Sequence, residues 1–118
     1  YLDGAHNLPA LSRLVEFIRQ QGQKEIFLLF GALKRKNYQG MLSYLQQELP
    51  HVQLFVTTFE DDGAANEQDF TNGLYIASYQ DFIEQFIKSA NDNQLLFVTG
   101  SLYFIAEVRA FLLEKEID

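Results

Sequence analysis

Cysteine is absent from this 118-residue sequence, which therefore contains neither a disulfide framework nor a thiolate metal site. That composition is compatible with a reducing compartment. Long hydrophobic runs are absent too: no apolar segment approaches the roughly 20 residues that span a bilayer, and no signal-peptide pattern starts the chain. We therefore expect a cytoplasmic protein that does not enter a membrane.

Basic residues are few. The chain has 9 Lys and Arg against 16 Asp and Glu, and its formal net charge of -7 disfavours binding to nucleic acid or to an anionic membrane. The hydrophobic fraction of 47% and the charged fraction of 21% are those of a globular protein. The length fits one domain, and the chain starts without Met, close to a predicted strand. We expect residues 1–118 to be a single domain of a longer polypeptide.

Apolar residues recur with two alternating patterns along the chain. Helical spacing predicts helices over 8–18, 38–49, 82–87 and 104–112, with Pro9 in the first turn of the first of them. Short, nearly continuous apolar runs predict strands over 24–30, 52–59 and 94–100, and a shorter one over 74–78. Residues 60–73 are expected to form a loop with room for one helical turn.

Strands that alternate with helices indicate an α/β fold, here a three-layer, Rossmann-like domain with a mainly parallel sheet and helices on both faces. Ligands of such folds bind at the carboxyl ends of the strands. Three predicted strand exits carry small or polar residues at 3–7, 31–37 and 99–103. We expect the three exits to share one edge of the sheet.

The first exit, DGAHN, joins a strand to a helix N-terminus, where free N–H groups favour a carboxylate or phosphate. Asp3 can accept hydrogen bonds from ribose hydroxyls, while His6 and Asn7 can donate to an anion. Asn7 alone is equally well explained as a helix cap. Asp3 and His6 together favour a functional site.

The second exit, GALKRKN, places Lys34, Arg35 and Lys36 together in an acidic protein. One lysine can neutralise an anionic ligand, although the run by itself fits a solvated turn better. In the third exit, VTGSLY, Ser101 is either an ordinary helix cap or a hydrogen-bond donor to a carboxylate.

Several chemistries have no support. Neither a GxxxxGK[ST] phosphate loop nor a GxGxxG fingerprint is present, so the chain does not bind a nucleotide by those devices. His51 follows Pro50 at the opposite end of the predicted sheet and is expected to be structural. No obvious cluster completes a metal site around Asp3 and His6. The acidic residues at 60–62 do not match a calcium loop and are expected to be a solvated surface.

Three segments together resemble a known family: LDGAHN before an amphipathic helix, then FGALKRKNYQGML, then FVTGSLYFIAEVR. In this order they are similar to the C-terminal domain of folylpolyglutamate synthase, also called dihydrofolate synthase, in the Mur ligase superfamily. The similarity spans nearly the whole chain, with DGAHN as its most specific motif. Two departures occur: Leu8 separates Asn7 from Pro9, and Arg35, Lys36 and Asn37 stand where the family commonly has Asp-Lys-Asp.

The resemblance implies the C-terminal domain of a two-domain, ATP-dependent ligase that joins glutamate to a folate or dihydropteroate. In that family ATP and Mg²⁺ activate the folate carboxylate as an acyl phosphate, which the glutamate amine attacks. The phosphate loop and most Mg²⁺ contacts belong to the N-terminal domain, so residues 1–118 alone are expected to be inactive.

The resemblance also implies roles for individual residues. Asp3 is expected at the nucleotide, and no catalytic residue or metal ligand is assigned. The residues expected at the incoming glutamate are His6, Asn7, Ser101, and Lys34 or Lys36. A dianionic ligand is chemically suited to a helix N-terminus, an imidazole, a hydroxyl and a lysine.

Two alternatives stay open. One is another Mur-type amino-acid ligase, acting on cell-wall precursors. The other is a non-catalytic, flavodoxin-like binding module.

Overall fold

Five strands form one sheet in the part of the protein that the computed structural model describes, residues 1–5 and 7–117. The strands are β1 (Leu2–Asp3), β2 (Glu25–Gly31), β3 (Gln53–Thr57), β4 (Leu74–Ile76) and β5 (Gln94–Gly100). Their order is β1-β5-β2-β3-β4, and every neighbouring pair is parallel. The chain thus returns after β4 to insert β5 between the first two strands.

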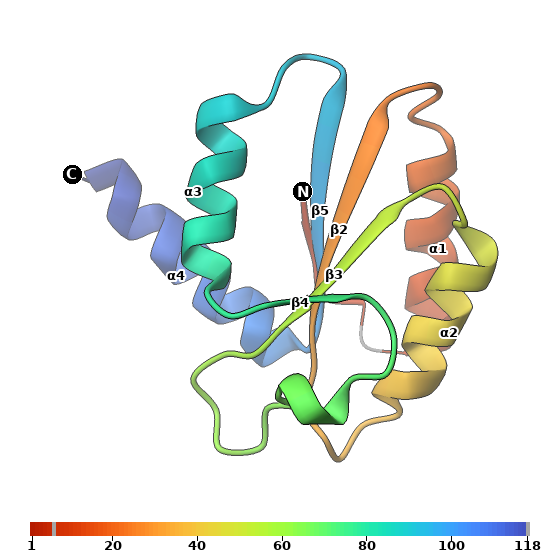
Figure 1. The fold of residues 1–118 in the computed structure, drawn as a ribbon, viewed down its shortest axis with the longest axis vertical. Helices are drawn as coiled ribbons and strands as arrows, with labels where there is room; N and C mark the ends of the chain where they lie inside the picture. Colours follow the sequence, from red (N-terminus) through yellow and green to blue (C-terminus); the bar gives the residue numbers. More distant parts are fainter. Residues whose placement is uncertain (6, 118) are drawn as a thin grey trace.

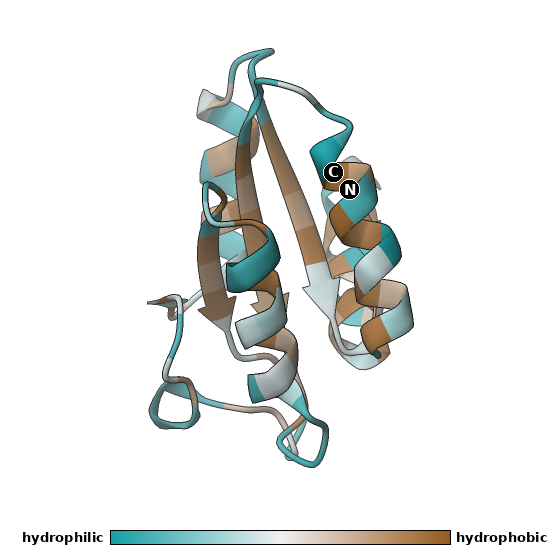
Figure 2. Cartoon of the chain, turned by 90° about the vertical axis from the view of Figure 1, so that its right-hand side faces the viewer, coloured by the Kyte–Doolittle hydropathy of each residue, from teal (hydrophilic) through white to brown (hydrophobic). Residues whose placement is uncertain are grey.

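Helices cover both faces of this sheet. Helices α1 (Leu8–Arg19) and α2 (Tyr38–Glu48) lie on one side, and α3 (Tyr79–Ser89) and α4 (Leu102–Ile117) lie on the other (Figure 1). The strands are largely hydrophobic, whereas hydrophilic residues gather on the loops and helix turns (Figure 2). The expected three-layer α/β fold with a parallel sheet is confirmed.

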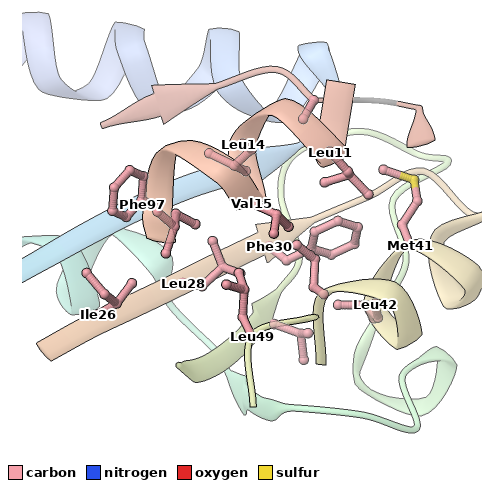
Figure 3. Close-up of a cluster of buried hydrophobic side chains, with 14 of the residues drawn as sticks. Leu11, Leu14, Val15, Ile26, Leu28, Phe30, Met41, Leu42, Leu49 and Phe97 are labelled. Atoms are coloured by element: carbon pink, nitrogen blue, oxygen red, sulfur yellow. The ribbon is translucent and has the colours of Figure 1, made fainter. Parts of the chain in front are cut away.

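The core consists of two apolar clusters, one on each face of the sheet. In the larger, side chains of α1 and α2 pack on β2 and β5, including Leu11, Met41, Phe30 and Phe97 (Figure 3). The apolar positions of α1 that recur at helical spacing are buried, except for Leu8, which is exposed at the start of the helix. Gly22, with φ of +73°, follows the helix end. The second cluster places Phe104 of α4 against the opposite face.

The segment between β3 and β4 is held to the loop after β2. It contains the short 3-10 helix η1 (Glu67–Asp69), which agrees with the single helical turn expected within this loop. An antiparallel bridge pairs Leu33 with Ala64, and the Ala65 amide donates to the Ala32 carbonyl at 2.8 Å. The loop after β2 is therefore fixed from one side by backbone hydrogen bonds.

Across the described residues, no helix combines the length and the apolar character that crossing a membrane requires.

Candidate functional site

The carboxyl ends of three neighbouring strands lie level with one another. Asp3 of β1 pairs in register with Thr99 of β5, and Gly100 of β5 pairs with Gly31 of β2. The three exits therefore meet at one edge, as predicted. On this edge α1 and α2 leave toward one face and α4 toward the other (Figure 1), which is where parallel sheets open a crevice for ligands.

Backbone contacts join the exits of β5 and β2. Gly100 has φ of +121°, and a Cβ atom at this position would lie 2.0 Å from the Gly31 carbonyl oxygen. The amide of Ser101 donates a hydrogen bond to that same oxygen at 2.9 Å. Only glycine permits this approach, which brings Ser101 next to the loop that follows β2.

Ser101 begins α4. Its Oγ accepts a hydrogen bond from the Tyr103 amide at 3.1 Å, and its carbonyl accepts one from the Ile105 amide at 3.0 Å. Ser101 is thus a helix cap, which was one of its two sequence interpretations. Ser101 also borders a pocket, and contact between its hydroxyl and a ligand stays a prediction.

That pocket has a volume of about 170 Å³ and lies between the second and third strand exits. Its lining combines two cations, a small serine and three larger apolar or aromatic side chains: Leu33, Arg35, Lys36, Ser101, Leu102 and Tyr103. We refer to it as the exit pocket. It brings together two segments about 65 positions apart in the sequence, which are the second and third predicted strand exits.

The two lysines proposed from the sequence point to different surroundings. Lys36 lines the exit pocket. The Nζ atom of Lys34 lies 3.9 Å from Oδ2 of Asp69 in η1, and Lys34 is not among the residues that line the pocket. This placement favours Lys36 over Lys34 for contact with a ligand.

Arg35 is the charged residue of the pocket for which no contact with a ligand was predicted. The KRK run indicated a basic turn, but periodicity does not say which side chains of a turn face inward. Asn37, which stands where the family commonly has Asp, caps α2: its Oδ1 accepts a hydrogen bond from the Gly40 amide at 3.2 Å. The departure from the family pattern at Asn37 therefore preserves a helix cap.

At the first exit, Asp3 is half-buried at the end of β1. Asn7 is exposed and caps α1, because its Oδ1 accepts a hydrogen bond from the Ala10 amide at 2.9 Å. Its capping interpretation is confirmed, and its contact with glutamate stays a prediction. His6 lies outside the described residues, so its predicted role also stays a prediction.

Thr99 belongs to the third predicted exit, but its sequence context indicated no role for it. It is fully buried, and its Oγ1 has no hydrogen-bond partner among the described residues. Because Phe97 faces the α1 and α2 cluster, Thr99, two residues later in the strand, faces the same side. A buried hydroxyl without a partner costs about 1–3 kcal/mol, so this position is a local weakness in the edge.

The exit of β3 is tied to the helices by one carboxylate. Glu107 of α4 accepts hydrogen bonds from the Tyr79 hydroxyl at 2.6 Å and from the Glu60 amide at 2.9 Å. Burial, followed by this carboxylate, raises the pKa of Tyr79 well above its usual value, so the phenol remains a proton donor. The acidic side chains at 60–62 are exposed, as predicted.

Two other features that the sequence raised are the location of His51 and metal binding. His51 is exposed in the turn between α2 and β3, at the opposite end of the sheet, as expected. Among residues 1–5 and 7–117, no group of three or more His, Cys, Asp or Glu side chains is placed to hold a metal ion.

Comparison with known proteins gives both a family and a fold for this chain. Residues 1–102 match the family described as Mur ligase, glutamate ligase domain. The dihydrofolate synthase/folylpolyglutamate synthase of Bacillus subtilis (strain 168) is 34% identical over 116 residues, which cover 92% of this chain and 26% of that protein. The chain thus spans about a quarter of this relative.

Two solved structures confirm the fold. The bifunctional folylpolyglutamate synthase/dihydrofolate synthase of Yersinia pestis, complexed with AMPPNP and a Mn ion, matches with a TM-score of 0.77 at 24% identity over 94% of this chain and 28% of its own. A structure of such a bifunctional enzyme with Mn, AMPPNP and L-glutamate bound gives a TM-score of 0.76 at 24% identity, with the same coverage. Together with the family match over residues 1–102, these similarities show that the chain belongs to the glutamate ligase domain family of the Mur ligases.

Proposed function

We propose that residues 1–118 form the C-terminal domain of a two-domain, ATP-dependent ligase that joins L-glutamate to a folate or dihydropteroate. The support is the 34% identity to a dihydrofolate synthase/folylpolyglutamate synthase, of which the chain matches 26%. In this proposal the domain binds the incoming glutamate and part of the nucleotide. An N-terminal domain supplies the phosphate loop, which this sequence lacks.

The exit pocket is the observation that carries the proposal. Its two cations, Arg35 and Lys36, lie near the N-terminus of α4 and the hydroxyl of Ser101. Each of these features attracts a carboxylate: the cations by charge, the helix end by its unpaired N–H groups, and the hydroxyl by donating its hydrogen. Glutamate carries two carboxylates, so a pocket with this lining in a protein of net charge -7 suits it.

The nucleotide is assigned to the first exit. Asp3 is half-buried at the end of β1 and can accept hydrogen bonds from ribose hydroxyls, beside the N-terminus of α1. Asn7 and His6 are assigned to the incoming glutamate, as the resemblance implies. The use of ATP is supported by similar structures that were solved with AMPPNP.

Mg²⁺ is assigned mostly to the N-terminal domain. Asp3 alone does not make a divalent cation site, and the described residues offer no cluster of acidic or histidine side chains that could complete one. The similar structures contain Mn, which fits a ligase that uses ATP with a divalent metal. No step of the reaction is therefore assigned to a metal held by this domain.

In the proposed reaction this domain acts on the nucleophile. ATP transfers its γ-phosphoryl group to the folate carboxylate, the glutamate amine attacks the resulting acyl phosphate, and phosphate leaves as the amide forms. The exit pocket holds glutamate by its carboxylates and leaves the amine free to attack. Orientation of two reactants in this way is a large part of what an enzyme can contribute.

The acceptor distinguishes this function from that of other Mur-type ligases. The full-length protein should be titrated with dihydropteroate, reduced folates and a muramyl nucleotide, each with ATP, Mg²⁺ and L-glutamate, while ADP release is recorded. Release that depends on both glutamate and a pteroate or folate supports the proposal. Release supported only by the muramyl nucleotide would assign the protein to cell-wall synthesis instead.

A further inference from the structure

We infer that Arg35 selects the incoming amino acid by binding its side-chain carboxylate, and so makes the exit pocket specific for an acidic substrate. The inference rests on the proposed function, because it concerns the same pocket. It adds a residue and a task that neither the family motifs nor the pattern of the basic run identified.

The first observation is that Arg35 has no anionic partner within the described part of the chain. Arg35 lines the exit pocket, and its exposed side chain forms no ion pair or hydrogen bond with a described residue; the same holds for Lys36. Some basic side chains have anionic partners: Arg19 pairs with Glu16 and Glu48 at 2.9 Å, and Lys34 pairs with Asp69. Arg13 and Arg109 have no ion pair with a described residue either, but they do not line the exit pocket. Two adjacent cations without counter-charges in an acidic protein form a site that attracts an anion.

The second observation is that the turn carrying Arg35 is fixed. The Lys36 amide donates to the Leu33 carbonyl at 3.1 Å, which closes the turn around Arg35. The turn is anchored on one side by the Lys34 amide, which donates to the Gly63 carbonyl at 2.8 Å, and on the other by α2, where the Tyr38 amide donates to the Lys36 carbonyl at 2.7 Å. A guanidinium displayed from a fixed backbone loses less entropy when it binds a ligand.

The third observation is how the pocket distributes its polar and apolar groups. Ser101 lies at the strand edge, where its amide is bonded to Gly31, whereas Arg35 is a central residue of the turn beyond that edge. Leu33 and Leu102 supply apolar surface to the same pocket. A ligand with an anionic group at each end and a short methylene chain between them matches this order.

These observations divide the two carboxylates of glutamate between the two ends. Ser101 and Lys36 take the carboxylate next to the reacting amine. Arg35 takes the side-chain carboxylate, because its planar fork of N–H donors pairs with both oxygens of a carboxylate at once. A neutral amide in that position would present an NH₂ group to the guanidinium, which has no acceptor for it.

The test compares L-glutamate with L-glutamine in the full-length protein. These ligands have the same size and differ in the side-chain charge. The measured quantity is kcat/KM for each amino acid at saturating ATP and pteroate; if glutamine is not turned over, its inhibition constant against glutamate replaces kcat/KM. Arg35→Gln is the test variant, Arg35→Lys the conservative variant, and Lys34→Gln the matched control in the same turn.

We expect Arg35→Gln to lower kcat/KM for glutamate by about tenfold to a hundredfold, the range for a lost hydrogen-bonded charge contact, and to leave the value for glutamine nearly unchanged. Arg35→Lys should keep part of the preference for glutamate over glutamine, and Lys34→Gln should keep the full preference. An unchanged midpoint of thermal unfolding in the Arg35 and Lys34 variants would show that their fold is intact.

Equal losses for glutamate and glutamine in Arg35→Gln would overturn the inference, as would an equal loss of preference in Lys34→Gln. Either result leaves the proposed function standing, because glutamate-dependent ADP release by the wild-type protein tests that function separately. A wild-type protein without such release would remove the proposed function and this inference together.

Discussion

The Ser101 amide donates a hydrogen bond to the Gly31 carbonyl oxygen at 2.9 Å, and this bond joins the end of β5 to the end of β2. Both residues border segments that line the exit pocket. The bond exists because β5 lies between β1 and β2, although 69 positions separate Gly31 from Gly100, its partner in the register. The pocket therefore forms because the order of strands in the sheet places these two strand ends side by side.

Substitution of Gly100 should break this junction. Gly100→Ala places a methyl group 2.0 Å from the Gly31 oxygen at a φ of +121°, so the two strand ends must separate. We expect the free energy of unfolding, measured by urea titration, to fall by about 3 kcal/mol or more, from backbone strain and overpacking together.

Gly22→Ala is the matched control for Gly100→Ala. Gly22 also has a positive φ, +73°, but nothing lies within 4 Å of a Cβ atom built there. This change should cost only the conformational penalty of about 1–2 kcal/mol. Equal costs at the two glycines would contradict the steric explanation for the junction.

Two buried threonines, at the ends of the strands on either side of β2, should respond with opposite signs to the loss of a hydroxyl. Thr99→Val removes an oxygen that has no partner among the described residues, so the free energy of unfolding should rise by about 1 kcal/mol. Thr57 is equally buried, but its Oγ1 donates to the Ile76 carbonyl at 2.7 Å. Thr57→Val should therefore lower the free energy of unfolding by about 1–2 kcal/mol. A loss at both positions would show that Thr99 has a partner in solution.

Asp3→Ala should act mainly on the nucleotide in the full-length protein. Loss of hydrogen bonds to a ribose is expected to raise the apparent KM for ATP by about tenfold, with a smaller change in the glutamate constant. Initial rates at varied ATP and varied glutamate separate the two effects. A change confined to glutamate would contradict the assignment of Asp3.

Ser101→Ala should have two separable effects. Loss of the cap of α4 should lower the free energy of unfolding by about 1 kcal/mol, and loss of a contact with glutamate should raise its KM by an amount equivalent to about 1.5–3 kcal/mol. Ser78→Ala is the control, because Ser78 caps α3 by accepting a hydrogen bond from the Asp81 amide at 3.2 Å and does not line the exit pocket. Ser78→Ala should lower the free energy of unfolding and leave the glutamate KM unchanged.

His6→Ala should raise the glutamate KM by a similar factor, and the double variant with Ser101→Ala should cost less than the sum. Residues that share one ligand are coupled, which a double-mutant cycle on the glutamate constant measures. Additive effects on stability, with the glutamate constant unchanged, would make both residues structural.

The 118-residue chain by itself should neither hydrolyse ATP nor form an amide, because it lacks a phosphate loop. ADP release by the purified chain, measured against a heat-denatured control, checks this. Steady release above that control would mean that the nucleotide is bound and cleaved by this domain without a partner domain.

The sequence by itself determined the type and order of the elements. Each of the described helices carries apolar residues at helical spacing, and each longer strand is a short apolar run, because burial against a layered core imposes those periods locally. α1 shows this most clearly: its buried face, its proline near the start and its Asn7 cap could all be predicted. The common edge of the three exits followed, since parallel strands end on the same side.

Only the tertiary structure decided which side chains meet at that edge. The insertion of β5 between β1 and β2 depends on crossovers and register between distant segments, and no local pattern encodes it. The three cations of KRK are equivalent in sequence, yet η1 takes Lys34 as the partner of Asp69, while Arg35 and Lys36 line the exit pocket. The physical reason is that a turn has no repeating face, so the contacts made by its side chains are set by the segments that the fold places against it.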